Sequence, residues 1–576
     1  MTIHRRRTTT LIGLALTVVG VGTALAVPQD NTSNSPSTSR QPHVVPTAEG
    51  VHTRSMLTVL DDASRQDDAP IPPNNRFAGI PDGIGLAPKP GSNNYFAYVN
   101  HELSETRGRV RDHGEIGSFV DRIEIDPSDD RVVGVTDLIK DVRYWNYTTE
   151  TYQAGPNVAG ADTPDSRPDT DGEPYDTQRA PLNRWCSSSI TEFGQLYNDD
   201  TGRGTRLRVY FGNEEGGDNS RTFGVTEDGI ATQLPRLGLF SWENTLAAYN
   251  ESDTTLVMGN EDTGFTPSGT TVPGGQLWAY VGKKQRTGTT IERAGLNNGE
   301  NFVIDLKDEA TSTDNEFRAK YDKHNPRPFD LAFVDWDAGS TKQNQEARDE
   351  GMSFNRIEDG VWDPDDEDTF YFLVTAGFFD DTTTPPTTVN DGQLWKLEYK
   401  DIERPQRGGK LELLLDGSEP IRSNAASELG PLNNPDNITI RDGNLLIQED
   451  PGNDPRLARV LAYRTSDGAL TTIGEFKPAN YAETPTEDEE SSGIIDASEY
   501  YGLGDDDDDD RRDRRRRDDD DDDDDARTGA GVFLLDTQIH SPTDPEAVEA
   551  GQLLKLTVDS WDAVYGSSDP GQDDDD

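Results

Sequence analysis

The chain has 576 residues and a formal charge of −55, from 109 acidic and 54 basic side chains. A surface this acidic repels nucleic acid and anionic membranes, which excludes them as partners, and it attracts cations. The block at 505–525 contributes −9 and the last four residues −4, so the remaining chain still carries −42. Such a surface repels itself unless salt screens it, and at molar salt the Debye length is about 3 Å. We therefore expect a halophilic protein.

The first 27 residues have the pattern of an export signal. Arg5, Arg6 and Arg7 precede a short apolar run that ends in small residues before Val27. This pattern predicts a signal peptide of the twin-arginine type, and hence a secreted or cell-surface protein without integral membrane association after processing. A retained membrane anchor is the alternative. Residues 28–45, rich in Ser, Thr, Asn and Pro, are expected to form a flexible linker.

Beyond residue 45 the chain alternates short runs of Val, Ile, Tyr and Phe with clusters of Gly, Asp, Asn and Pro, a pattern typical of many short strands. One strand recurs as GGQLWAY at 274–280, DGQLWKL at 391–397 and AGQLLKL at 550–556. Repeats of about 40–50 residues that cannot bury both faces alone predict an all-β chain folded as a β-propeller, six-bladed and with loop insertions, and a β-sandwich is the alternative. The six expected units are 79–126, 204–248, 250–306, 353–400, 435–476 and 492–558.

We predict that residues 46–565 form this single propeller domain, followed by an acidic tail at 566–576. Residues 143–185, rich in Pro, Asp and Thr, lack a strand pattern and are expected to form a long loop. The Asp/Arg block at 505–525 cannot build a core and is expected to be a disordered insertion within the last unit.

The single cysteine, Cys186, excludes an intrachain disulfide framework. It lies in the aromatic-flanked sequence NRWCSSS with no histidine nearby in sequence to activate it. We therefore expect a packed core thiol and not a nucleophile.

Acidic residues terminate strands in nearly every unit, as in GNEE at 212–215 and GNED at 259–262. In a propeller such strand ends converge on the central axis, where clustered carboxylates repel one another unless cations lie between them. Carboxylate oxygens suit hard cations, above all Ca²⁺. In a chain with 109 acids some would also end strands by chance. The predicted metal ligands are Glu102, Glu214, Glu215, Glu243, Glu261, Asp262, Glu358, Glu449 and Glu490.

Several of these motifs, in their order along the chain, resemble the PhoX-type alkaline phosphatases and their secreted relatives. The similar segments are GIPDGIG at 79–85, VNHE at 99–102, GNEE, RLGLFSWE at 236–243, FNRIEDG at 354–360 and PDNITIRDGNLLIQED at 435–450. The resemblance implies a six-bladed propeller, twin-arginine export, several calcium ions, a pair of irons and hydrolysis of phosphate esters. It also implies that Arg356 holds the phosphate, and that metal ligands or their neighbours are Glu102, Glu214, Glu243, Glu261 and Glu358.

The chain departs from the family at two positions. Asn213 replaces the cysteine of the family's Cys-Glu-Glu, whose thiolate binds iron, and Trp242 stands where the family often has histidine. A site with only oxygen ligands favours calcium and disfavours iron.

Two functions therefore stay open. The first is a monomeric, secreted hydrolase of small phosphate esters, with Arg356 binding the phosphate above the metal cluster. The second is a calcium-stabilised propeller without catalysis that serves as a binding or surface protein. In that case Arg356 forms a salt bridge to Glu358 or Asp359.

Overall fold

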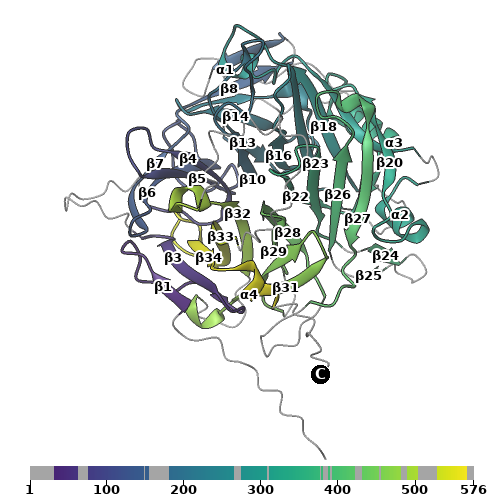
Figure 1. The fold of residues 1–576 in the computed structure, drawn as a ribbon. Helices are drawn as coiled ribbons and strands as arrows, with labels where there is room; N and C mark the ends of the chain where they lie inside the picture. The colour runs from purple at the N-terminus through teal and green to yellow at the C-terminus, as the bar shows by residue number, and fades with distance from the viewer. Residues whose placement is uncertain are drawn as a thin grey trace, which may run out of the picture.

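The fold is described from a computed structural model of the full chain (Figure 1). The described residues are 31–61, 76–147, 149–154, 181–264, 274–307, 311–376, 378–380, 387–389, 392–421, 431–452, 456–481, 489–503 and 529–566. The expected signal peptide, the acidic insertion at 505–525 and all but residue 566 of the expected tail lie outside them.

Six four-stranded antiparallel blades surround a central axis, which confirms the predicted propeller (Figure 1). Each inner strand contacts the inner strands of the two neighbouring blades, so that the ring is closed. From blade 1 to blade 6 the inner strands are β4 (Pro81–Pro88), β10 (Trp185–Ile190), β16 (Trp242–Ala247), β22 (Ile357–Trp362), β28 (Pro435–Arg441) and β32 (Glu489–Asp496).

The other three strands of each blade follow outward from the axis. The second strands are β5 (Tyr95–His101), β13 (Val209–Glu214), β17 (Thr254–Glu261), β23 (Thr369–Val374), β29 (Asn444–Glu449) and β33 (Gly531–Pro542). The third strands are β6 (Phe119–Asp126), β14 (Thr222–Thr226), β18 (Gly275–Lys283), β26 (Gln393–Tyr399), β30 (Arg459–Arg464) and β34 (Glu549–Val558). The outer strands are β7 (Arg131–Asp137), β15 (Ile230–Gln233), β19 (Glu300–Leu306), β27 (Gly409–Leu415), β31 (Ala469–Phe476) and β3 (Val51–Thr58).

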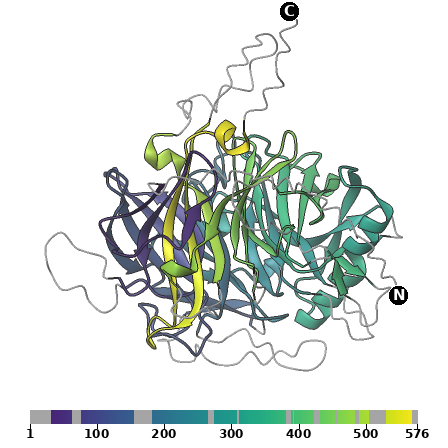
Figure 2. The same ribbon diagram turned by 90° about the horizontal axis from the view of Figure 1, so that it is seen from below.

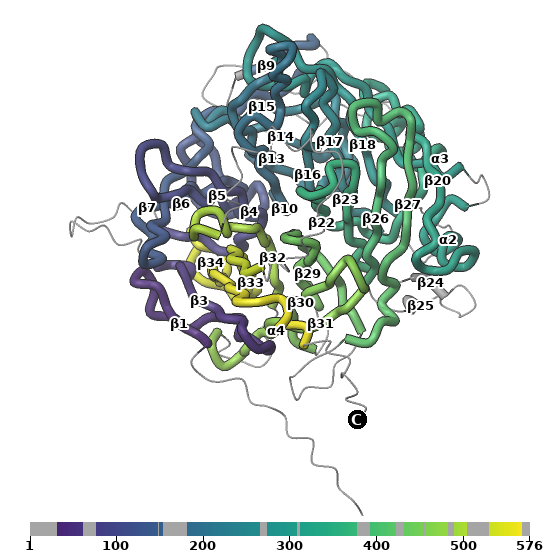
Figure 3. The backbone as a smooth tube through the Cα atoms, viewed as in Figure 1, coloured from purple at the N-terminus to yellow at the C-terminus, as the bar shows by residue number. Residues whose placement is uncertain are grey.

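The N-terminal part of the described chain closes the ring. Strand β3 pairs antiparallel with β34 and thereby completes blade 6, as the purple and yellow tubes show side by side in Figure 3. Two short strands extend the outer edges: β1 (Thr32–Asn34) pairs with β3, and β2 (Val44–Pro46) pairs with β31 of blade 5. The expectation of a flexible linker at 28–45 is therefore wrong for its described part, because its backbone groups join two blades.

Two blades carry additions. In blade 2, β8 (Asp141–Asn146) runs parallel to β15 and pairs with β9 (Thr151–Ala154), so the expected loop at 143–185 contains strands in its described part. Between blades 3 and 4, β20 (Arg327–Val334) pairs with both β19 and β27 and joins the two blades into one sheet. The remaining short elements are β11 (Tyr197–Asn198), β12 (Arg203–Gly204), β21 (Ser353–Phe354), β24 (Phe378–Asp380), β25 (Thr387–Val389), η3 (Pro235–Leu237), α1 (Thr290–Arg293), α2 (Asp314–Lys320), α3 (Ser340–Glu350), η4 (Pro405–Arg407), η5 (Pro478–Asn480), η6 (Ser498–Tyr501) and α4 (Trp561–Tyr565).

The expected units differ from the blades at their first or last strand, and 79–126 and 353–400 omit the outer strands β7 and β27. The unit 435–476 coincides with blade 5, whereas 204–248 omits the inner strand β10 and includes β16 of the next blade. The sequence of β10, WCSSSI, has a run of serines and lacks the apolar pattern of a typical strand. Its position on the axis, where polar side chains face one another, explains that composition.

The core lies between the blades, because neighbouring sheets pack face to face. Strand β23 reads TFYFLV, and all six of its residues are buried. Between blades 2 and 3 the Phe240 ring stacks on Trp242 and Trp278, with ring centroids 3.8 and 4.6 Å apart. The result is a body that is wider than it is tall when seen from the side (Figure 2). In the part of the chain that the structure covers, no helix has the length and apolarity of a bilayer-spanning segment.

Candidate metal centre

The second residue of every inner strand is a carboxylate or a thiol. We call these six residues the axial ring: Asp82, Cys186, Glu243, Glu358, Asp436 and Glu490. In five blades the ladder register shifts directly after the first strand residue, for instance between Pro81 and Ile84, which is the mark of a β-bulge. Bulges re-aim side chains beside functional sites. The inner strands thus present one potential metal ligand per blade at a common level.

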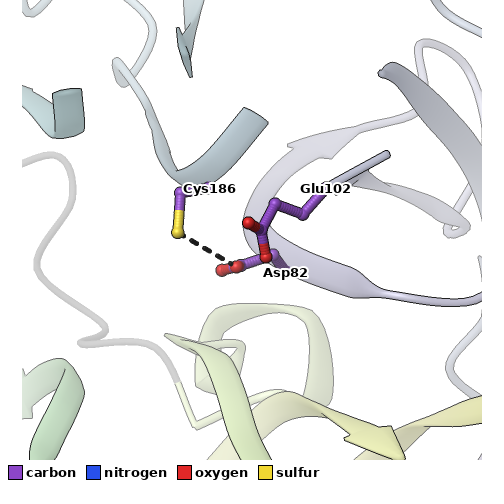
Figure 4. Close-up of side chains that lie close together, drawn as sticks. All are labelled: Asp82, Glu102 and Cys186. Carbon is purple, nitrogen blue, oxygen red and sulfur yellow. Dashed lines mark hydrogen bonds between the residues drawn. The ribbon is translucent and has the colours of Figure 1, made fainter. Parts of the chain in front are cut away.

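Two trios of ligand atoms lie close together. In the first trio, Asp82, Glu102 and Cys186 offer atoms that all lie within 4.8 Å of one another. Figure 4 shows their side chains converging from blades 1 and 2, with Cys186 Sγ 3.5 Å from Asp82 Oδ2.

The second trio is Glu243, Glu358 and Asp436, which come from three consecutive blades and meet the same distance criterion. All three ligands are carboxylates.

Both trios are electrostatically unfavourable without a cation. Burial, followed by repulsion from neighbouring carboxylates, raises the pKa of Asp82, Glu243 and Asp436 well above the usual range. Burial likewise raises the pKa of the Cys186 thiol and of Glu358. A bound cation would offset this repulsion and keep the ligands charged, as metal sites require.

A second set of side chains comes from the ends of the second strands, where the sequence reads Asn-His-Glu, Asn-Glu-Glu, Asn-Glu-Asp or Gln-Glu-Asp. The first residue of each triplet binds an inner strand. Asn100 donates to the carbonyls of Trp185 and Cys186 at 2.6 Å, and Gln448 donates to Ser491 and Ser492. These amides fix neighbouring blades to one another.

The second residue of each triplet points back into its own blade. Glu214 forms a buried ion pair with Arg221 at 2.5 and 2.6 Å, and Glu449 forms one with Arg459 at 2.6 and 2.7 Å. Glu261 Oε2 accepts from the Trp278 indole at 2.8 Å. The expectation that Glu214, Glu261 and Glu449 are metal ligands is therefore not supported by their positions, because alternation along a strand turns successive side chains to opposite faces.

The third residue of each triplet faces the axis above the ring. These residues are Glu102, Glu215, Asp262 and Asp450. Burial raises the pKa of Glu102 to about 7, that of Glu215 to about 8 and that of Asp450 to about 7. Three predicted ligands lie in the trios: Glu102, Glu243 and Glu358. Glu490 belongs to the axial ring, and Glu215 and Asp262 lie beside the trios.

Three cationic side chains, from blades 2, 4 and 6, lie among these acids. Arg184 contacts Glu102 at 2.6 Å and also Glu215. Arg356 donates to both oxygens of Asp262, at 2.7 and 2.8 Å, and lies 3.2 Å from Glu358. His540 contacts Glu549 and Glu490 at 2.9 and 3.4 Å.

Arg184 and Arg356 occupy equivalent places, two residues before an axial-ring residue. Both have positive φ, at 44° and 70°, a conformation that non-glycine residues rarely adopt. Their side chains are 47 % and 42 % exposed. Among the described residues, carboxylates contact Arg184 through its Nη2 and Arg356 through its Nε and Nη2. Donors therefore remain on each guanidinium for an anion.

Beneath the ring, the next residues of four inner strands form a polar belt. Asn244 donates to Asp359 at 2.6 Å, and Asn437 donates to Ser187 across the axis. Asp359 is thus bound to Asn244, and the salt bridge proposed between it and Arg356 is not formed in this structure.

Sequence analysis missed Asp82, Asp436, Arg184 and His540, and it assigned Cys186 to the core. The structure instead places Cys186 in the first trio. The expectation of a site with only oxygen ligands is therefore wrong for this trio. A usable signal was present: inner strands open with Pro-Asp in two blades and with Trp-Cys and Trp-Glu in two others. Aligning the blades on their inner strands would have revealed it.

Comparison with known proteins supports the fold. No family model matches the chain, and no curated protein matches it. The solved structure of Pseudomonas fluorescens PhoX in complex with vanadate, a transition state analogue, has a TM-score of 0.57 with 11 % identity, and the match covers 91 % of this chain and 97 % of that one. The AtxE2 isopeptidase, matched over 81 % of this chain and 59 % of that one at 12 % identity, has a TM-score of only 0.20. At these identities the likeness concerns the fold alone.

Proposed function

We propose that this chain is a secreted, metal-dependent hydrolase of small phosphate esters, acting as a monomer. The observation that carries the proposal is the contact of Arg184 with Glu102 of the first trio and of Arg356 with Glu358 of the second. Each guanidinium is half-exposed and keeps unused donors, while the carboxylates beneath can hold cations. An anion that binds the arginines would then lie close to the metal ligands.

The donor atoms fit the metals that the PhoX resemblance implies. Five of the six axial-ring residues are carboxylates, which suits calcium, and the second trio offers oxygen alone. The first trio includes a thiol, a ligand that softer metals such as iron accept. We therefore propose calcium in the second trio. A site with only oxygen ligands disfavours iron, but this argument does not apply to the first trio, because Cys186 contributes sulfur.

Each part of the site would have a defined role in the reaction. Metal ions would supply Lewis-acid stabilisation of the negative charge that develops on the phosphoryl oxygens. Arg356 would donate to a phosphoryl oxygen through Nη1, because Nε and Nη2 already contact Asp262 and Glu358. Asp262 would hold that guanidinium in place through its paired hydrogen bonds, and Arg184 would bind the ester from the opposite side.

One observation favours the non-catalytic alternative. Arg184 and Arg356 already have carboxylate partners, so their charges are balanced without any substrate. In that case the propeller would be a calcium-stabilised extracellular binding protein.

An activity assay separates the two functions. The purified chain, loaded with calcium in molar salt with and without added ferric iron, should hydrolyse an aryl phosphate, and vanadate should inhibit it. Folded, metal-loaded protein that hydrolyses neither phosphomonoesters nor phosphodiesters would favour the binding propeller. Elemental analysis of the same sample would identify the bound metals.

A further inference from the structure

Asp536 is a buried carboxylate without a visible counter-charge. It lies in the middle of β33, has no exposed surface, and neither of its oxygens has a hydrogen-bond partner among the described residues. An ionised carboxylate in such surroundings costs several kcal/mol unless a cation or donors compensate it. Asp536 lies two residues before Gln538. In blades 1 and 2 the residues two positions before the corresponding amides, Asn100 and Asn213, are Tyr98 and Phe211.

Two more buried oxygens without partners belong to the neighbouring residues. Gln538, two residues along β33 and on the same face, leaves its Oε1 without a donor. Its amide nitrogen donates to Asp82 Oδ2 at 3.3 Å and to Ser492 Oγ at 3.0 Å. Asp82 Oδ1 is also without a partner in the described structure. Asp82 and Gln538 are 2 % and 1 % exposed.

The backbone brings these groups together between blades 6 and 1. Ser492 pairs across the ladder with Asp536, and the next residue, Gly493, packs on Asp82. A Cβ built on Gly493 would lie 2.3 Å from the Asp82 carbonyl oxygen. The absence of a side chain there allows the inner strands to approach, and Gln538, on the same face of β33 as Asp536, contacts Asp82 directly.

We propose that Asp536, Gln538 and Asp82 bind a hard divalent cation, of the calcium class, in the interior between blades 6 and 1. Two carboxylates balance its charge, and the carboxamide oxygen adds a neutral ligand of the type that calcium accepts. Asp536 and Gln538 belong to neither trio, and Asp82 would contribute Oδ1. The ion would join the last blade to the first, where the ring closes, and its role would be structural.

Calcium stoichiometry of Asp536→Asn tests the site. Full-length protein is loaded with calcium at molar salt, passed into calcium-free buffer of the same salt, and analysed for calcium per chain. The variant should retain one ion fewer than the wild type. Glu214→Gln is the matched control, since it removes a buried carboxylate that Arg221 already neutralises, and it should retain the wild-type number. Equal calcium in wild type and Asp536→Asn would overturn the proposal and leave Asp536 as a neutral acid.

A second measurement needs only folded wild-type protein and a milder variant. Tb³⁺ substituted for calcium should show a luminescence component whose lifetime lengthens less from H₂O to D₂O than that of hydrated Tb³⁺, because the buried ligands replace most of the coordinated water. Gln538→Met, which removes the Oε1 ligand and keeps both carboxylates, should abolish this component. A wild-type protein without such a component, or a component that survives in Gln538→Met, would contradict the site.

Discussion

Arg356 at the start of blade 4 donates two parallel hydrogen bonds, 2.8 and 2.7 Å long, to the carboxylate of Asp262 at the end of a strand of blade 3. Such a paired geometry fixes the plane of the guanidinium as well as its position. The neighbouring Glu358 belongs to the second trio, so the arginine is held beside the potential metal ligands. The contact between blades therefore holds the Arg356 guanidinium beside the candidate metal centre.

If the site hydrolyses phosphate esters, Arg356→Ala should lower kcat/KM for an aryl phosphate by about 10²-fold or more. This corresponds to about 2.7 kcal/mol of lost transition-state stabilisation. Calcium content should stay unchanged, because the arginine is not a metal ligand. Arg404→Ala is a suitable control, since Arg404 pairs with Asp401 in an exposed turn. An Arg356→Ala enzyme with wild-type activity would rule out the phosphate-binding role.

Two buried glutamates should respond differently to loss of charge. Glu243→Gln, in the second trio, should lose metal and activity together, because it removes a charged ligand. Glu214→Gln should keep its metal but unfold more easily, by about 3–5 kcal/mol, because the buried Arg221 loses its charged partner. Elemental analysis and denaturant unfolding of both variants check this contrast. Loss of metal in Glu214→Gln alone would contradict the assignment.

Chelation of calcium at constant molar salt should lower the melting temperature by about 5 °C or more. Ions that bind only the folded state stabilise it by mass action, by about 2.7 kcal/mol for each ion present at 100 times its Kd. Calorimetry with and without chelator gives the shift, and excess calcium should restore the original transition. An unchanged transition would mean that the clustered carboxylates hold no stabilising calcium.

Cys186→Ser should reduce retention of iron and leave calcium in the second trio. The thiol contributes the soft ligand of the first trio, whereas the second trio offers carboxylates only. Elemental analysis after loading with both metals measures the two contents separately. Equal iron in wild type and variant would return Cys186 to the role of a packed core thiol.

The buried His43 should make stability depend on pH. Burial lowers its pKa to about 3, whereas an unfolded histidine titrates near 6.5, so between these values only the unfolded state takes up the proton. Stability from this residue is present above about pH 6.5 and falls as the pH drops toward 3, by up to about 1.4 kcal/mol per pH unit. His43→Gln should flatten this part of the curve. Parallel curves for the two proteins, measured by urea unfolding, would contradict the argument.

The repeated strands and the acidic strand ends were sufficient, within the sequence, to predict a propeller with carboxylates at its axis. Those features are local: alternation and turn residues specify strands, and the recurrence of GGQLWAY-like segments gives the period. Local sequence also identified Glu102, Glu243 and Glu358, because each lies where a strand begins or ends.

Only the tertiary structure decided which acids share the site. Glu214 and Glu215 are neighbours in sequence, yet one pairs with Arg221 inside its blade and the other contacts Arg184 near the axis. Alternation assigns them to opposite faces, but which face meets the axis depends on how the sheets pack. Cys186 joins Asp82 across more than 100 positions because blade closure brings inner strands together. Proximity of this kind arises from the ring, and no local pattern encodes it.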